Sequence, residues 1–210
     1  MPLKPTRDYL KETIGLDPET VGLPMVNRVI QKHMHRCGSR TSTEHLSLLR
    51  SSKEKSKELV ELAVVNETWF MRQPEAFRYI KEKLCTNKNN LLRTLSLGCA
   101  TGEEPYSLAM TLLDAGLTAE QFTIDALDIS ETSLQIAKTG QYREKSFSKA
   151  IDSTFRDTHF TASDEHYKIK PATRNCVNFI YGNVLDLASA LTAPSYDIIL
   201  CRHVIIYLCH

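Results

Sequence analysis

The sequence predicts an α/β protein, in which a helical N-terminal segment precedes a parallel β-sheet wound with helices. Residues 1–65 show only helical spacing of apolar residues, whereas short apolar runs alternate with helical stretches in the rest of the chain. At the first alternation a strand-like run, a loop bracketed by two glycines and a helix follow one another. That order is typical of a Rossmann-like fold, which binds ligands beyond the carboxyl ends of its strands.

The composition is that of an ordinary globular protein. The chain has 210 residues, of which 42% are hydrophobic, and it carries 26 basic against 25 acidic side chains. This balance gives no reason to expect a nucleic-acid partner, and no apolar run is long enough to span a membrane. The N-terminus lacks the apolar segment of a secretory signal, so we expect a cytoplasmic protein.

The cysteines and histidines predict neither disulfides nor a metal site. Six cysteines are scattered without a C-x-x-C pair, which favours the reduced state of the cytoplasm. The seven histidines form no H-E-x-x-H motif, and His33 and His35 would face different ways on a helix. We therefore expect no metal.

The N-terminal segment contains start and stop signals for several helices. One helix is predicted over Leu23–Arg36, with Pro24 at its start and Gly38 just past its end. Two capping boxes, each pairing a Ser or Thr with a Glu three residues later, predict further short helices opened by Thr41 and Ser51.

A basic stripe, Arg28, Lys32 and Arg36, recurs every four residues along the predicted helix. Residues 1–65 as a whole carry 11 Lys and Arg against 8 Asp and Glu. Such a stripe is most often a solvated helix face. The alternative is a surface that docks an acidic partner, and the residues alone leave both interpretations open.

The loop Gly98–Gly102 connects the predicted strand Arg93–Leu97 to a helix with Pro105 in its first turn. Its G-x-x-x-G spacing differs from the G-x-G-x-x-G pattern that holds a pyrophosphate. Glu103 and Glu104 stand where a phosphate would lie, and they would repel an anion and attract a cation. S-adenosylmethionine fits, because it has no phosphate and bears a sulfonium and an α-ammonium. The alternative is a pair of acids favoured by the helix dipole.

The second predicted strand, Gln121–Ile129, carries Asp128 at its carboxyl end. In Rossmann-like folds an acid at this place hydrogen-bonds the hydroxyls of a ribose. Strand, glycine loop, helix, strand and acid together predict a nucleoside-binding half-site.

The remaining segments complete the predicted α/β order. Apolar spacing and turn residues predict two helices and two further central strands, over 74–84, 130–138, 178–181 and 196–201. An insertion over about 141–176 interrupts this order with short runs that indicate a small antiparallel sheet, over 155–160, 165–170 and 176–179.

Several blocks of the chain resemble the chemotaxis receptor glutamate O-methyltransferases, the CheR family. The most specific block is Gly98–Ser107, with the sequence GCATGEEPYS. Weaker blocks occur in family order and at roughly family spacing, at Asn66–Arg72, Asp128–Ile129, Thr139–Arg143 and Cys201–Tyr207. The resemblance covers nearly the whole chain.

This resemblance implies a domain order and a reaction. Residues 1–65 would form a helical receptor-docking domain, and 66–210 a class I SAM-dependent methyltransferase domain with the 141–176 insertion. Sheets of this class have more strands than the four predicted here, so we expect a sheet truncated after its fourth strand. The reaction would transfer a methyl group from S-adenosylmethionine to glutamate side chains of chemotaxis receptors in sensory adaptation, leaving S-adenosylhomocysteine.

The resemblance also assigns site residues. We predict Arg72 and Tyr207 as catalytic and the basic stripe as the receptor-docking surface. Trp69 and Phe70 would anchor in the core between the domains. Most members of the family have Asn where this chain has His203. The predicted cofactor-binding residues are Asn66, Thr68, Arg72, Gly98, Glu104, Asp128, Asn183, Val184, Arg202 and His203.

The expected partner is the cytoplasmic domain of methyl-accepting chemotaxis receptors. We expect a cytoplasmic monomer that is recruited to membrane receptor arrays, with no nucleic-acid partner and no direct membrane insertion. Two alternatives stay open. One is a truncated, catalytically weak or inactive cofactor-binding module that docks on receptors, and the other is a methyltransferase for another substrate.

Overall fold

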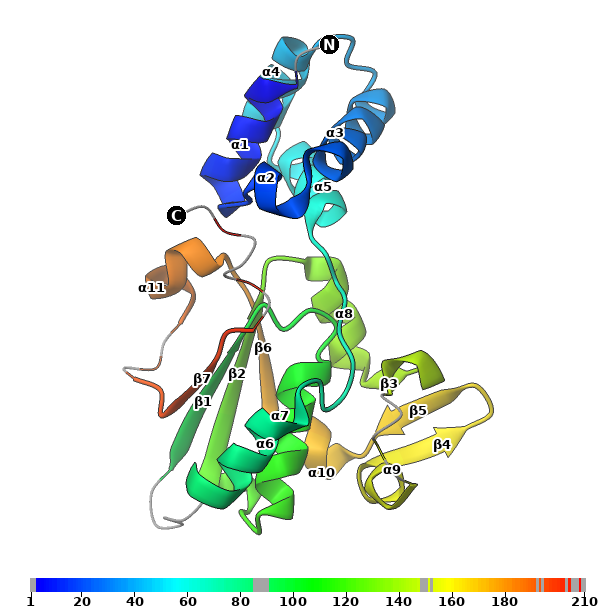
Figure 1. Cartoon of the computed structure of the whole chain (residues 1–210), viewed down its shortest axis with the longest axis vertical. Coiled ribbons are helices and arrows are strands. Elements are labelled where there is room, and N and C mark those ends of the chain that lie inside the picture. The colour runs from blue at the N-terminus through cyan, green and yellow to red at the C-terminus, as the bar shows by residue number, and fades with distance from the viewer. Residues whose placement is uncertain are drawn as a thin grey trace. The chain divides into compact units, whose positions relative to one another are not determined.

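A computed structural model describes residues 3–84, 91–147, 151, 153–191, 193, 195–202, 204 and 208. The chain divides into two compact units (Figure 1). The first comprises the chain up to Val65 with Asn183–Leu185 and the described residues after Cys201. The second comprises Asn66–Gly182 and Asp186–Cys201. Within the described ranges, none of the helices combines the length and apolar character needed to cross a membrane.

The first unit is built from helices packed around a small apolar core. Four side chains with 0–2% of their surface exposed, Leu10, Ile30, Leu49 and Leu59, come from four different helices. The helices are α1 (Lys4–Ile14), α2 (Pro18–Val21), α3 (Leu23–Cys37), α4 (Ser42–Ser51) and α5 (Lys53–Ala63).

The helix boundaries in this unit follow the local signals, with one correction. Gly38 ends α3 with φ +71°, and the Thr41 hydroxyl accepts the Glu44 N–H at the start of α4. The prediction that Ser51 opens the next helix was wrong by one residue. Ser52 caps α5 by accepting the Lys55 N–H at 3.3 Å, because Ser51 still belongs to the last turn of α4.

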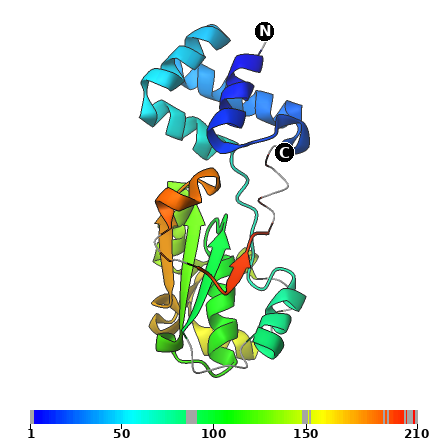
Figure 2. The same ribbon diagram turned by 90° about the vertical axis from the view of Figure 1, so that its left-hand side faces the viewer.

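The second unit contains a four-stranded parallel sheet in the order β6-β2-β1-β7 (Figure 2). The predicted α/β fold with a parallel central sheet is confirmed. In the register of β1 with β2, Leu97 lies opposite Leu127, so both strands end at the same edge. The strands are β1 (Leu92–Leu97), β2 (Phe122–Asp128), β6 (Val177–Tyr181) and β7 (Ile198–Leu200).

Helices cover this sheet unequally. α6 and α7 lie on one face, and the short α11 lies on the other (Figure 1). Leu108 and Leu112 of α7 pack with Phe77 of α6 against apolar strand residues in one buried cluster. The helices of this unit are α6 (Pro74–Tyr79), α7 (Glu103–Asp114), α8 (Glu131–Thr139), α9 (Ser153–His159), α10 (Pro171–Arg174) and α11 (Leu187–Ala190), with a π-helical turn over Ile80–Leu84 and 3-10 turns over Ala119–Gln121 and Glu144–Ser146. A further 3-10 turn, Val184–Asp186, begins in residues of the first unit and ends at Asp186 of the second.

The predicted antiparallel insertion is present, but two of its three predicted runs differ. Its sheet has the order β3-β5-β4, with β3 (Gln141–Tyr142), β4 (Phe160–Ser163) and β5 (His166–Ile169). Residues 155–159 form helix α9 rather than a strand, and 177–179 belong to β6 of the main sheet. A partial alternation of apolar and polar residues over about five positions is compatible with either a helix or a strand. Which of the two forms depends on whether a neighbouring strand is available for pairing.

Candidate functional site

The Gly98–Gly102 loop turns the chain from β1 into α7 with three residues in left-handed backbone. Gly98, Ala100 and Gly102 have φ values of +70°, +46° and +93°. The N–H groups of Gly98 and Cys99 both donate to the Leu127 carbonyl, at 2.8 and 3.1 Å. The loop is therefore fastened to the end of β2, as the predicted half-site requires.

Asp128 holds this loop with its side chain. One carboxylate oxygen accepts the Ala100 N–H at 2.7 Å, and the other accepts the Ser130 N–H at 2.8 Å. The residue is 7% exposed. Asp128 thus has a structural role that the sequence did not predict, because it joins the glycine loop to the start of α8. Its contact with a ribose stays a prediction, and an ionised carboxylate offers about four lone-pair positions for such contacts.

The two adjacent acids of the loop lie in different environments. Glu103 is 2% exposed and accepts the Thr101 hydroxyl at 2.6 Å, and burial raises the pKa of its carboxyl. Glu104 is partly exposed and accepts the Ser96 hydroxyl from β1 at 2.7 Å. Glu104 is therefore the more accessible of the two acids, and its contact with a ligand stays a prediction, whereas Glu103 belongs to the packing of the second unit.

The difference in exposure between the two acids predicts that only one of two matched variants loses affinity. We expect Glu104→Gln to weaken S-adenosylhomocysteine binding by about 1.5–3 kcal/mol, because it removes the charge that would face the ligand's ammonium. Glu103→Gln, the control, should leave the affinity unchanged because its carboxyl is buried. Titration calorimetry on both variants measures this. Equal losses in the two would contradict the assignment.

The Asn66–Arg72 segment is anchored next to α7 within the second unit. Phe70 is fully buried and contacts Tyr142, Phe147 and Phe160 with ring centroids 4.7–5.1 Å apart. The next residue, Met71, donates its N–H to the Ser107 hydroxyl at 2.9 Å. The predicted anchoring of Phe70 between domains was wrong, because its partners belong to the insertion that follows α8.

Arg72 is held by its own segment. Its guanidinium donates to the Glu67 carbonyl at 2.7 Å and lies 4.2 Å from the centroid of the Trp69 ring. Trp69 is only partly buried and serves as a platform for this cation, rather than as a core anchor as predicted. Thr68, which lies between Glu67 and Trp69 in the sequence, is partly exposed, and Asn66 is exposed.

The other predicted site residues fall outside this group. Asn183, Val184 and Arg202 group with the first unit, where Asn183 donates to the Thr13 carbonyl at 2.8 Å. Their roles toward a cofactor stay predictions. His203 and Tyr207 lie outside the described residues. The basic stripe of Arg28, Lys32 and Arg36 is exposed along α3.

Residues that the sequence did not single out complete the support of the loop. The Tyr142 hydroxyl donates to the Thr101 carbonyl at 2.7 Å, and Tyr106 donates to the Ala137 carbonyl at 3.0 Å. The Ser96 hydroxyl donates to Glu104, and the Ser107 hydroxyl accepts the Met71 N–H. Tyr106 and Ser107 lie in the Gly98–Ser107 block that carries the family resemblance. The resemblance therefore included both residues but did not indicate which groups they contact.

The chain is similar in sequence to known proteins. The family model for the CheR methyltransferase, SAM binding domain, matches residues 66–210. A "Probable biofilm formation methyltransferase WspC" of Pseudomonas putida is 39% identical over 206 residues, which cover 95% of this chain and 48% of that protein. "Chemotaxis protein methyltransferase 1" of Pseudomonas aeruginosa is 27% identical over 213 residues, covering 96% of this chain and 77% of that protein. The chain spans about half the length of the WspC proteins it matches.

Proposed function

The chain belongs to the CheR methyltransferase family, and from this membership we propose that it methylates glutamate side chains of a receptor. S-adenosylmethionine is the cofactor that the matched domain binds. The proposed products are a glutamate methyl ester and S-adenosylhomocysteine. Residues 1–65 would recognise the receptor, and 66–210 would hold the cofactor.

The observation that carries the proposal is the pairing of the glycine loop with a partly exposed carboxylate. The left-handed residues of the loop bring backbone close to a ligand, and Glu104 places negative charge at the start of α7. A phosphate ligand would be repelled there, whereas the ammonium of S-adenosylmethionine would be attracted. Glu104 and Asp128 would hold the cofactor together with Gly98 and Thr68.

The chain's own residues would act by positioning. Bound S-adenosylmethionine supplies an electrophilic methyl group. A glutamate is already ionised at neutral pH, so no general base is needed, and orientation of the reactants supplies most of the acceleration. Arg72 would orient the attacking carboxylate by a charge-assisted hydrogen bond, because Trp69 and Glu67 hold its guanidinium on the segment next to α7.

A second candidate concerns the biological process. Two relatives at 39% identity are named for biofilm formation, whereas relatives named for chemotaxis are 26–32% identical. This order of similarity favours a methyl acceptor that acts in biofilm formation. The proposed chemistry is the same in both cases, and only the receptor differs.

Transfer of a labelled methyl group tests the proposed function. The full chain is incubated with tritiated S-adenosylmethionine and cytoplasmic fragments of receptors of both kinds. We expect label on the fragments that is released by base, as a methyl ester is, and its loss in Arg72→Ala. Cofactor binding without transfer to either kind of fragment would support a binding module instead.

The basic stripe predicts a variant that affects the receptor and spares the cofactor. Reversing Lys32 and Arg36 to Glu should slow methylation at low salt and leave cofactor affinity unchanged, because both side chains are exposed on α3. The difference from the parent should shrink at high salt, since exposed charges are screened beyond about 8–10 Å. Methylation rates at two salt concentrations measure it.

The control for this variant reverses two exposed lysines of the second unit, Lys138 and Lys168. It makes the same change in net charge at another place on the chain. If the control slows methylation as much as the stripe variant does, the stripe is only a solvated helix face.

A further inference from the structure

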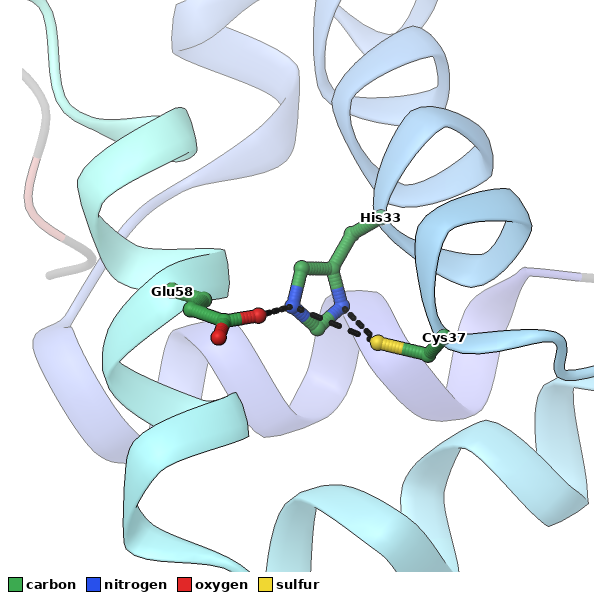
Figure 3. Close-up of side chains that lie close together, drawn as sticks. All are labelled: His33, Cys37 and Glu58. Atoms are coloured by element: carbon green, nitrogen blue, oxygen red, sulfur yellow. Dashed lines mark hydrogen bonds and ion pairs between the residues drawn. The ribbon is translucent and has the colours of Figure 1, made fainter.

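A cluster of three potential metal ligands lies in the helical unit, apart from the methyltransferase loop. His33 and Cys37 are four residues apart on α3 and share one helix face, and Glu58 reaches them from α5 (Figure 3). The ligand atoms of the three side chains all lie within 4.8 Å of one another. His33 is fully buried, and Cys37 and Glu58 are partly exposed.

The distances within the cluster suit a tetrahedral ion. Nε2 of His33 lies 3.8 Å from Cys37 Sγ and 3.6 Å from Glu58 Oε2. The ligands of a tetrahedral Zn²⁺ with bond lengths of about 2.0–2.3 Å are themselves about 3.3–3.8 Å apart. A separation of 3.6 Å between nitrogen and oxygen is also too long for a good hydrogen bond. The three ligand atoms are thus close enough for one ion, which would draw the Cys37 thiol from beside the ring toward Nε2.

A chain of buried polar groups behind His33 can fix its ring for metal binding. Its Nδ1 lies 2.7 Å from His45 Nε2, and His45 Nδ1 lies 3.4 Å from the Thr6 hydroxyl. When each ring carries its proton on Nδ1, His33 donates to His45 and His45 donates to Thr6. That arrangement leaves the lone pair of His33 Nε2 on the side of Glu58, whereas Cys37 Sγ lies beside the ring, 3.7 Å from Nδ1 and 3.8 Å from Nε2. Histidine ligands of metals usually donate their other ring N–H in this way.

The charges around the cluster are compatible with a divalent cation. The buried rings of His33 and His45 contact each other through Nδ1 and Nε2, 2.7 Å apart. The hydrogen bond from Lys55 lowers the pKa of Glu58 and keeps it ionised. The Lys55 ammonium donates to both oxygens of Glu58, at 2.8 Å to Oε1 and 3.0 Å to Oε2, so an ion on Oε2 would share this carboxylate with Lys55.

We propose that His33, Cys37 and Glu58 bind a Zn²⁺ ion in the helical unit, with water as the fourth ligand. One imidazole, one thiolate and one carboxylate form a donor set that Zn²⁺ accepts readily. The ion would fasten α3 to α5 and, through His45 and Thr6, to α4 and α1. Binding would replace the Cys37 thiol proton, which leaves to solvent as the thiolate–zinc bond forms.

This site was not expected from the sequence. Spacing within one segment excluded a pair of His33 with His35, and that exclusion stands because His35 is exposed on α3. The third ligand comes from a different helix, 21 residues beyond Cys37 in the sequence. Only the packing of α5 against α3 brings it to the other two.

Cobalt substitution tests the proposal on the full chain. The protein is treated with a chelator and titrated with Co²⁺, and the absorption of the complex is recorded before Zn²⁺ is added. We expect one equivalent of Co²⁺ to give a thiolate-to-cobalt charge-transfer band, which Zn²⁺ then displaces. Zn²⁺ should also raise the midpoint of thermal unfolding of the parent, because it binds the folded state.

Variants at the partly exposed ligands decide the outcome, because they leave the buried core intact. Cys37→Ser should abolish the charge-transfer band and the thermal shift, and Glu58→Gln should weaken Co²⁺ binding at least tenfold. His45→Gln should weaken it by about 10–100-fold, the usual effect of losing a group that supports a ligand.

Two matched controls complete the experiment. Cys201→Ser removes a thiol from the second unit, and His35→Gln removes an exposed imidazole from the same helix, so both should behave as the parent. Absence of the charge-transfer band in the parent would overturn the proposal. A band of equal strength in Cys37→Ser would overturn it as well.

Discussion

Asp128→Ala should weaken the binding of S-adenosylhomocysteine and destabilise the second unit at the same time. Loss of a charged hydrogen bond to a ribose would reduce the binding free energy by about 1.5–3 kcal/mol. The same change leaves the N–H groups of Ala100 and Ser130 without their acceptors, in a site where Asp128 is 7% exposed. A buried donor left without a partner costs about 1–3 kcal/mol of folding free energy.

Two measurements separate these effects. Calorimetry, carried out well below the unfolding midpoint, gives the affinity, and thermal denaturation gives the stability. Asp125→Ala is the matched control. It removes the same side chain from the same strand, three residues earlier, where the carboxylate accepts from the Asn178 and Tyr196 side chains and contacts no part of the loop.

Each measurement has an outcome that contradicts its part of the interpretation. Unchanged affinity in Asp128→Ala would remove this residue from the cofactor site and leave it a purely structural role. Unchanged stability would show that the two backbone amides find other acceptors when the carboxylate is removed.

Gly102→Ala should be the most destabilising single change in the loop. Gly102 has φ +93°, and left-handed backbone costs a residue with a Cβ about 1–2 kcal/mol. The added methyl group would also lie 2.8 Å from Cβ of Ala137 and 3.0 Å from the Tyr142 hydroxyl. Overpacking of this kind costs about 1–3 kcal/mol, because the helices α7 and α8 must move apart.

Thermal denaturation measures this effect, and each kcal/mol corresponds to about 2–4 °C for a chain of this size. We expect weaker cofactor binding as well, since movement of Tyr142 would release the Thr101 carbonyl. Gly22→Ala is the control, because Gly22 has φ +102° but, apart from its chain neighbours, no atom of the described residues within 4 Å of the added Cβ. The loss of stability in Gly22→Ala therefore measures the cost of backbone strain without the cost of overpacking. If both variants lose the same stability, the close approach to Ala137 has no energetic weight.

The sequence by itself determined the order of the elements and the kind of ligand. Short apolar runs between helical stretches predicted the four strands that the structure describes in the main sheet, because a parallel strand covered by helices is rich in apolar side chains. The glycine spacing and the acids after it predicted a loop for a cation-bearing nucleoside, because they act through local backbone geometry and charge. The family resemblance agreed with the matched domain model over residues 66–210.

The tertiary structure decided what each site residue contacts, because those partners are distant in sequence. Glu103 and Glu104 are adjacent, yet only the packing of α7 on the sheet buries the first and leaves the second partly exposed. Phe70 found its partners in the insertion rather than between domains, because the rings of Tyr142, Phe147 and Phe160 gather there. Glu58 reaches His33 and Cys37 only through the packing of α5 against α3. The spacing of residues within one segment predicts whether that segment forms a helix or a strand. Which side chains contact one another depends on how distant segments pack, and the spacing within a single segment does not show this.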